Sequence, residues 1–222
     1  MKETKFSGVY ELNIGKKILL TKNLVPGKKV YEERLFTEKN VEFREWDPRR
    51  SKLAAAILKG ISEIGIKKDD VVLYLGAATG TTASHISDII GRDGFIFAID
   101  FAPRVVRDLV FVCEDRKNIA PILADANRPA TYLGRVSLVD IVYMDIAQKN
   151  QAEIFLKNCE MFLRKKGYAY LAVKARSVDV TKKPKQVFNL VKRQIEEKLK
   201  ILDYRELGPF QKDHCFFCCR KE

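Results

Sequence analysis

The chain has 222 residues, of which 46% are hydrophobic, enough for one domain with a buried core or one domain with a small extension. Its net charge of +12 at pH 7 favours a polyanionic partner such as nucleic acid, the alternative being a generally basic, well-solvated surface. There is no run of eighteen apolar residues and no apolar stretch near Met1, so we expect a cytoplasmic protein with no membrane partner.

Residues 1–50 differ from the rest of the chain, because short β-like segments recur there between turn residues. The segments are residues 8–13, 16–23, 30–38 and 40–46, and the turns fall at residues 13–15, 26–27 and 39–40. We therefore expect residues 1–50 to form a small N-terminal β domain of antiparallel hairpins, and residues 51–222 to form a second, larger domain.

Residues 51–222 alternate between helical and buried-strand patterns. Helices are expected at residues 51–64, with Asp47 or Ser51 as the cap, and at 81–91, 103–116, 151–166 and 183–199. Strands are expected at residues 71–77, 94–100, 119–125, 138–146, 167–175, 200–210 and 214–221, the last two antiparallel. This order predicts an α/β fold with a doubly wound, mostly parallel, seven-stranded Rossmann-like sheet.

A glycine turn between the first strand and its helix suggests a nucleoside cofactor. Gly76 and Gly80 bracket the turn, and Asp100 ends the next strand, where an acid can accept hydrogen bonds from ribose hydroxyls. A dinucleotide site favours a third glycine, whereas this turn has Ala78 between its two glycines, so an NAD-dependent dehydrogenase is disfavoured. The spacing suits S-adenosylmethionine (SAM), the alternative being a strand–helix turn that binds nothing.

Four polar residues fall at or near the carboxyl ends of the predicted parallel strands: Asp100, Asp125, Asp145 and Lys174. Ligands of such folds bind at this edge of the sheet. A lysine beside an aspartate can orient a hydroxyl and stabilise developing negative charge, so Asp145 and Lys174 are expected to meet over the cofactor.

No metal site is expected. The chain has five cysteines, and its one C-x-x-C pair, Cys215 and Cys218, lacks the second pair that zinc usually needs. The segment around these cysteines is expected to be a hydrophobic terminal strand. His85, in the helix after the glycine turn, is expected to be structural.

Several motifs together resemble the fibrillarin family, the SAM-dependent methyltransferases of box C/D ribonucleoprotein particles. They are KNLVPGKKVYEERL, WDPRRSKLAAAILKG, LYLGAATGTTASHISDIIG, IDFAPRVVRDL, ILADANRPATY, VDIVYMDIAQKNQAEIF and GYAYLAVKARSVDV. The glycine- and arginine-rich tail of eukaryotic members is absent, so the resemblance is to archaeal members. It implies a SAM-dependent methyltransferase of RNA ribose 2′-hydroxyls.

The resemblance also implies which residues contact the cofactor. They are Gly76, Ala77, Gly80, Thr81, Thr82, Asp100, Phe101, Asp125, Ala126, Asp145 and Gln148. Asp100 stands where the family usually has glutamate, which moves the carboxylate back by one methylene. Phe101 can stack on adenine or can belong to the core.

Related 2′-O-methyltransferases use a Lys–Asp–Lys–acid set for catalysis. By resemblance its members are Lys52, Asp145 and Lys174, with Asp213 or His214 as the fourth. We expect Lys174 to be the principal base or orienting group and Asp145 to position it. The plainer alternatives are that Lys52 is a solvated helix residue and that His214 is packed at the start of a strand.

The basic excess suits the RNA backbone. Candidate phosphate contacts are Arg49, Arg50, Lys52, Lys174, Arg176, Lys182, Lys183 and Lys185. The resemblance implies a guide RNA that pairs with target rRNA, with tRNA as a further target, a Nop-type scaffold protein and a kink-turn-binding ribosomal-type protein. Two other functions stay open: methylation of a protein side chain such as glutamine, and a non-catalytic RNA-binding scaffold.

Overall fold

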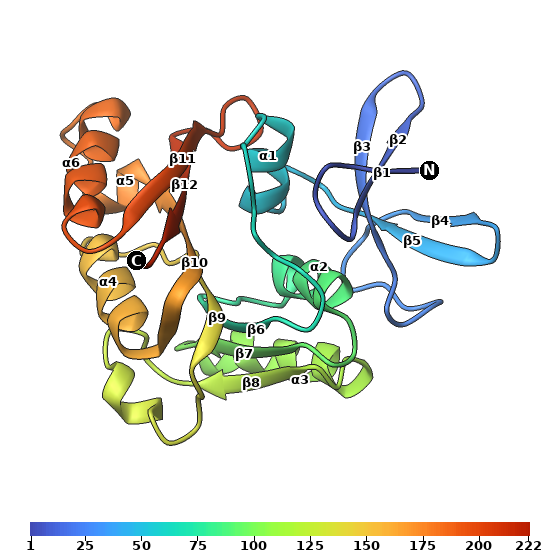
Figure 1. Cartoon of the computed structure of the whole chain (residues 1–222), viewed down its shortest axis with the longest axis horizontal. Coiled ribbons are helices and arrows are strands. Elements are labelled where there is room, and N and C mark those ends of the chain that lie inside the picture. Colours follow the sequence, from blue (N-terminus) through green and yellow to red (C-terminus); the bar gives the residue numbers. More distant parts are fainter.

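The computed structural model describes residues 1–222 and contains two sheets (Figure 1). The larger sheet has seven strands in the order β11-β12-β10-β9-β6-β7-β8. Six of them run in the same direction, and β12 runs in the opposite direction. The smaller sheet is antiparallel, with the order β1-β2-β3-β5-β4. The predicted fold, a seven-stranded, mostly parallel sheet preceded by a small antiparallel sheet, is confirmed.

The strands of the larger sheet are β6 (Val71–Leu75), β7 (Phe95–Asp100), β8 (Ile119–Leu123), β9 (Val139–Met144), β10 (Leu163–Lys174), β11 (Lys200–Glu206) and β12 (His214–Arg220). The helices are α1 (Lys52–Leu58), α2 (Thr81–Ile90), α3 (Pro103–Asp115), α4 (Gln151–Phe162), α5 (Ala175–Val178) and α6 (Pro184–Glu196), with a 3-10 turn at Pro129–Tyr132. The short helix α5 was not expected from the sequence.

Two predicted helices are shorter than expected. The helix at residues 51–64 ends at Leu58, because Gly60 adopts a left-handed φ of +78° and turns the chain away. The helix at residues 151–166 ends at Phe162, and β10 begins at the next residue, where Leu163 pairs with β9. Gly167 therefore lies inside a strand, at a break in register, and does not stop a helix.

The strands of the smaller sheet are β1 (Lys2–Glu3), β2 (Val9–Asn13), β3 (Lys17–Lys22), β4 (Leu35–Glu38) and β5 (Val41–Glu45). The strand expected at residues 30–38 begins only at Leu35, because the carboxylate of Glu33 folds back onto the amides of Val30 and Tyr31. Local hydrogen bonds of this kind compete with a strand ladder. The tight turn at Lys39 and Asn40 is as predicted, with φ values of +49° and +62°.

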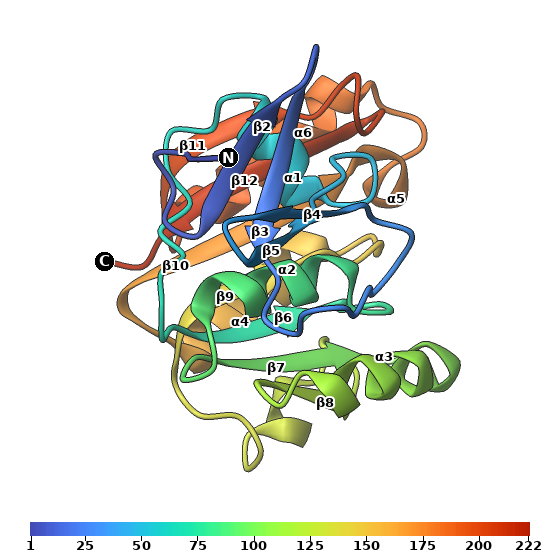
Figure 2. The ribbon, with the colours of Figure 1, turned by 90° about the vertical axis from the view of Figure 1, so that its right-hand side faces the viewer.

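The larger sheet is covered on both faces. Helices α4 and α6 pack on one face, and α1 and α2 lie on the other, with α3 beside β8 (Figures 1 and 2). The smaller sheet packs on the α2 side, where Phe6, Val9 and Trp46 join the same hydrophobic core as α1 and α2. The two sheets therefore share a core.

A buried ion cluster joins the two sheets. The guanidinium of Arg44 in β5 donates to Glu33 at 2.7 Å and to Asp88 of α2 at 2.9 Å, and Arg116 donates to the other oxygen of Asp88 at 2.6 Å. The side chains of Arg44, Glu33 and Asp88 have no exposed surface. Two cations and two carboxylates therefore neutralise one another inside the protein, which is how buried charges are tolerated.

His85 is structural, as predicted. Its ring nitrogens lie 2.7 Å from the Thr21 hydroxyl and 2.8 Å from the Tyr31 hydroxyl, and its ring stacks on Trp46 at 5.0 Å. Burial, aided by the charges of the nearby arginines, holds the pKa of His85 well below its usual range. None of the helices has the length and apolar character needed to span a lipid bilayer.

Candidate active site

A cleft opens at the carboxyl edge of the larger sheet, where β6 and β9 are neighbours although β7 and β8 lie between them in the sequence. This is the topological switch point of the sheet, the usual ligand site of such folds. The cleft has a volume of about 150 Å³ and is lined by Gly76, Ala78, Ile99, Asp100, Phe101, Ala124, Asp125, Ala126, Asp145, Ile146, Ala147 and Gln148.

The glycine turn keeps this cleft open. Gly76 has a φ of +79°, and a Cβ atom there would lie 2.5 Å from the carbonyl oxygen of Asp145. Gly80, the N-cap of α2, has a φ of +90°, and its Cβ would lie 2.9 Å from Leu109. Both positions therefore require glycine, one so that β6 can approach the end of β9 and the other so that α2 can pack against α3.

Asp100 and Phe101 form one side of the cleft. The Asp100 carboxylate accepts from the backbone amides of Ala78, at 3.0 Å, and of Ala102, at 3.1 Å. A carboxylate can accept about four hydrogen bonds, so this one has capacity left for a ligand diol. Phe101 is 65% exposed, so the alternative that it is a core residue is wrong.

These residues fit SAM. Its ribose needs hydrogen-bond acceptors beside a tight turn, and Asp100 supplies them. Its adenine needs a flat apolar contact and a polar edge, for which Phe101, Asp125 and the buried Ala126 are suited. Gln148 and Asp145 lie at the other end of the cleft lining. The structure does not bring Ala77, Gly80, Thr81 or Thr82 into that lining.

Lys52 and Asp145 form an ion pair. Lys52 is the first residue of α1, and its Nζ donates to Asp145 Oδ2 at 2.7 Å, with 22% of each side chain exposed. The partner of Asp145 is therefore Lys52 and not Lys174, which was expected to meet it. Lys174 ends β10, next to β9, and its exposed side chain makes no hydrogen bond or ion pair.

His214 lies at the same edge, paired with Lys174 in the β10–β12 ladder. Its Nδ1 lies 2.6 Å from the carbonyl oxygen of Lys212. Burial lowers the pKa of His214 below its usual 6.5; the contact with Lys212 and the charge of Asp145 oppose this shift, and the charges of Lys52 and Lys174 add to it. His214 is therefore neutral at pH 7, with both lysines and Asp145 near enough to act on its charge.

The side chain of Asp213 pairs with Arg176 of α5. Its carboxylate accepts from Arg176 Nε at 3.2 Å, and its own carbonyl accepts from the amide of Ala175. Its backbone is left-handed, with a φ of +56°. The turn before β12 therefore directs Asp213 to α5, while the next residue, His214, is the one that shares its electrostatic surroundings with Lys52 and Asp145.

Two tyrosines under the site were not singled out from the sequence. Tyr74 in β6 and Tyr143 in β9 are fully buried neighbours whose ring centroids are 4.4 Å apart. Burial raises the pKa of each hydroxyl, and the charge of Asp145 raises it further. Their place one residue before the end of each strand is the signal that could have identified them.

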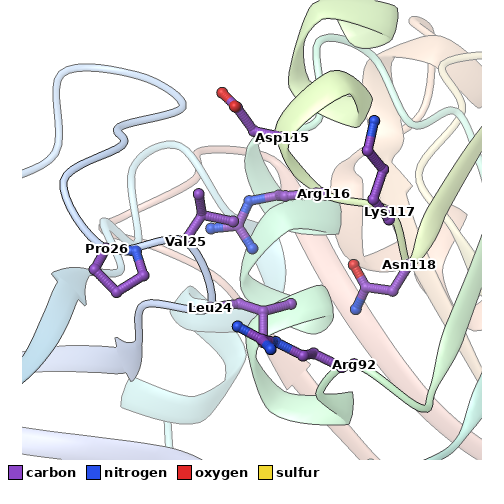
Figure 3. A pocket seen from close by; sticks show the side chains of 8 residues that line it. All are labelled: Leu24, Val25, Pro26, Arg92, Asp115, Arg116, Lys117 and Asn118. Atoms are coloured by element: carbon purple, nitrogen blue, oxygen red, sulfur yellow. The ribbon is translucent and has the colours of Figure 1, made fainter.

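A larger hollow, of about 440 Å³, lies between the Leu24–Pro26 loop and the end of α3 (Figure 3). Its other lining residues, Arg92 and residues 115–118, precede β7 and β8, so it lies at the amino edge of the sheet. The guanidinium of Arg116 in its wall is already bound to Asp88. None of the predicted site residues lies in this hollow.

The sheet order and the cleft at its switch point define the class of SAM-dependent methyltransferases. A SAM-dependent methyltransferase from Aquifex aeolicus shares the fold, with a TM-score of 0.55 at 18% identity over 79% of this chain and 99% of that one. Within that class, the chain belongs to the fibrillarin family, whose sequence model, described as Fibrillarin, matches residues 1–222.

Relatives are similar over the whole length of the chain. A fibrillarin-like rRNA/tRNA 2′-O-methyltransferase of Pyrococcus abyssi is 49% identical over 100% of this chain and 98% of its own. The structure of an Aeropyrum pernix fibrillarin with natively bound S-adenosyl-L-methionine has a TM-score of 0.91 at 48% identity, covering 98% of this chain and 96% of that one. A fibrillarin in complex with Nop5p also has a TM-score of 0.91, at 42% identity and with complete coverage of both chains.

Proposed function

We propose that this protein transfers the methyl group of SAM to ribose 2′-hydroxyls of rRNA and tRNA. The observation that carries the proposal is the Lys52–Asp145 pair, whose aspartate lines the cofactor cleft, with Lys174 and His214 at the same sheet edge. This arrangement suits a hydroxyl nucleophile, which needs orientation and removal of a proton. The Pyrococcus abyssi relative is named for this activity.

The cleft holds the cofactor through the contacts already described. Asp100 would accept from the ribose hydroxyls of SAM, Phe101 would stack on the adenine, and Asp125 with Ala126 would meet the adenine edge. When bound, SAM supplies an activated methyl group. The protein therefore has to position the acceptor hydroxyl and manage one proton.

Lys174 and the Lys52–Asp145 pair act on that hydroxyl. Asp145 anchors the Lys52 ammonium at 2.7 Å, which places a positive charge where the oxygen becomes more negative as its proton leaves. The exposed ammonium of Lys174 has no partner within the protein, so its donors are available to orient the hydroxyl. Lys174 is paired with His214 and ends the strand next to β9, a position that suits a general base or orienting group for this hydroxyl.

His214, and not Asp213, is the fourth member of the set. The carbonyl of Lys212 can only accept, so Nδ1 of His214 carries the hydrogen of that bond. In a neutral imidazole the other nitrogen, Nε2, is then an unprotonated acceptor. The depressed pKa keeps His214 in this form at pH 7, so it can accept a proton or a hydrogen bond as the acid of the Lys–Asp–Lys–acid set would.

The target RNA lies along basic surface beside His214. A hollow of about 510 Å³ next to it is lined by three lysines, Lys183, Lys185 and Lys212, and by the acids Glu206 and Asp213. Arg49 and Arg50, which precede α1, are exposed on the other side of Lys52. Lysines and arginines in these places contact phosphates and give affinity without choosing a sequence.

Target choice therefore comes from partners. The protein acts as the catalytic subunit of a box C/D particle, in which a guide RNA pairs with the target, a Nop-type scaffold docks the enzyme and a kink-turn-binding protein completes the assembly. The family member solved with Nop5p supports the scaffold. We place the protein in the cytoplasm with its RNA targets. We divide the chain into a small N-terminal β domain, residues 1–50, and a methyltransferase domain, residues 51–222, which pack on a shared core.

The test is methyl incorporation from labelled SAM by the chain alone and with guide RNA and both partner proteins. Incorporation into target RNA only in the full assembly is the expected result. Lys174→Ala is expected to slow the reaction at least 100-fold, while the control Lys117→Ala, an exposed lysine at the opposite sheet edge, keeps the wild-type rate. Near-normal turnover of Lys174→Ala would contradict its role, and labelling of a protein glutamine in place of RNA would contradict the proposed substrate.

A further inference from the structure

The side chain of Thr82 faces the start of α1. It is 6% exposed, and its hydroxyl donates to the hydroxyl of Ser51 at 3.0 Å. Neither Thr82 nor Thr81 lines the cleft that Asp100 and Phe101 form. The hydroxyl of Thr82, the second residue of α2, therefore points at the start of α1.

Ser51 holds the start of α1. It is fully buried, has the extended backbone of an N-cap, with φ −131° and ψ 120°, and its hydroxyl accepts from the amide of Ala54 at 3.4 Å. The helix that follows has only seven residues. A helix this short gains little from its own hydrogen bonds, so its first turn is fixed chiefly by its cap and by packing.

Lys52 is the first residue of this helix, directly after the cap, and its ammonium binds Asp145 at 2.7 Å. A line of buried polar contacts thus runs from Thr82 through Ser51 to the base of Lys52.

We propose that Thr82 and Ser51 are positioning residues that set the Lys52 ammonium against Asp145. This inference rests on the proposed function, because it assigns the two hydroxyls a part in the methyl-transfer step. The Thr82–Ser51 bond fixes where α1 begins, and the backbone at Ser51 fixes the direction in which Lys52 leaves the helix. Without the bond, the buried Ser51 hydroxyl keeps only the 3.4 Å contact from the Ala54 amide, and α1 shifts to give it a further partner.

The predicted effect falls on the reaction rate and not on cofactor affinity. A displacement of about 1 Å in a catalytic group can slow a reaction about 100-fold. Thr82→Val keeps the shape of the side chain and removes only its hydroxyl. We expect Thr82→Val to lower the single-turnover rate about tenfold in the assembled particle while its Kd for SAM stays within twofold of the wild-type value.

Two further variants separate positioning from simple destabilisation. Thr82→Ser restores the hydroxyl and is expected to recover at least half of the wild-type rate. Thr82→Val combined with Lys52→Ala is expected to be no slower than Lys52→Ala alone, because the hydroxyl acts through that lysine. Single-turnover rates are measured on particles assembled with guide RNA and both partner proteins. Calorimetry of each variant chain gives its SAM affinity.

Three results would overturn the inference. A large loss of SAM affinity in Thr82→Val with a normal rate at saturating SAM would make Thr82 a cofactor ligand. An additional loss of rate in the Lys52→Ala background, or no recovery in Thr82→Ser, would make it a general structural residue. Failure of the wild-type particle to methylate RNA is a different outcome, since it would contradict the proposed function itself.

Discussion

The substitution Gly76→Ala tests whether the glycine turn builds the cofactor cleft. An added Cβ would lie 2.5 Å from the Asp145 carbonyl oxygen and 3.0 Å from the Ile146 side chain, at a φ of +79°. The left-handed conformation alone costs about 1 kcal/mol for alanine. The contact with backbone can be relieved only if the end of β9 or the turn retreats by about 0.5 Å or more, which adds roughly 1–3 kcal/mol.

The control for this experiment is Gly15→Ala, in the hairpin between β2 and β3. Gly15 has nearly the same φ, +78°, but a Cβ there meets nothing within 4 Å. Gly15→Ala therefore has the energetic cost of a left-handed backbone without a steric contact at the added Cβ. We expect Gly15→Ala to lose about 1 kcal/mol of unfolding free energy and to bind SAM normally.

Gly76→Ala is expected to lose about 2–4 kcal/mol in denaturant unfolding and to bind SAM at least tenfold more weakly by calorimetry. The two readouts are measured on the same preparations of both variants. If Gly76→Ala bound SAM within twofold of the wild-type affinity, the turn would not be part of the cofactor site, and the reasoning from the close approach of β6 to β9 would be refuted.

Three other substitutions test the rest of the structure. Arg44→Met is expected to cost about 3–5 kcal/mol of unfolding free energy, because it leaves Glu33 and Asp88 buried with less positive charge. His85→Gln is expected to make the free energy of unfolding less sensitive to acid. In the wild type the unfolded chain takes up a proton on His85 near pH 6.5 and the folded chain does not. Wild-type stability therefore falls by up to about 1.4 kcal/mol per pH unit below that value. Phe101→Ala is expected to weaken SAM binding about tenfold, since stacking on a base contributes about 1–3 kcal/mol.

Two of these have a matched control, and His85→Gln is compared with the wild type. Arg34→Met removes a guanidinium that pairs with Glu45 at the surface, where the loss should stay below about 1 kcal/mol. Phe111→Ala removes another exposed phenylalanine, on α3, and should leave SAM affinity unchanged. Equal effects of a substitution and its control, or equal pH slopes for His85→Gln and wild type, would contradict the assigned roles.

The sequence predicts the sheet because its strands are continuous apolar runs that end in polar residues. Asp100 ends β7 itself, and Asp145 follows the last residue of β9, so the rule that parallel strands place their ends together brings them to one cleft. Helix ends are less predictable, because the apolar stripe of residues 51–64 continues past Leu58, where the backbone at Gly60 already turns away.

Contacts between distant segments are beyond what the sequence pattern contains. Lys52 and Asp145 are 93 positions apart, and only the packing of α1 over the sheet makes them partners. Lys174 ends β10, the strand next to β9, so the pattern of strand ends alone indicates Lys174 as the partner of Asp145. In the same way, nothing local distinguishes Thr82 from Thr81, although the packing of α2 turns one of them to Ser51.

The most direct measurement is methyl transfer from labelled SAM by the assembled particle to two target RNAs that differ in one atom. One RNA has ribose throughout, and the other has a 2′-deoxy sugar at the nucleotide that the guide selects. A ribose 2′-O-methyltransferase labels the first RNA at that nucleotide and leaves the second unlabelled. Equal labelling of both RNAs would show that the methyl group goes to another atom and would contradict the roles given to Lys52, Asp145, Lys174 and His214.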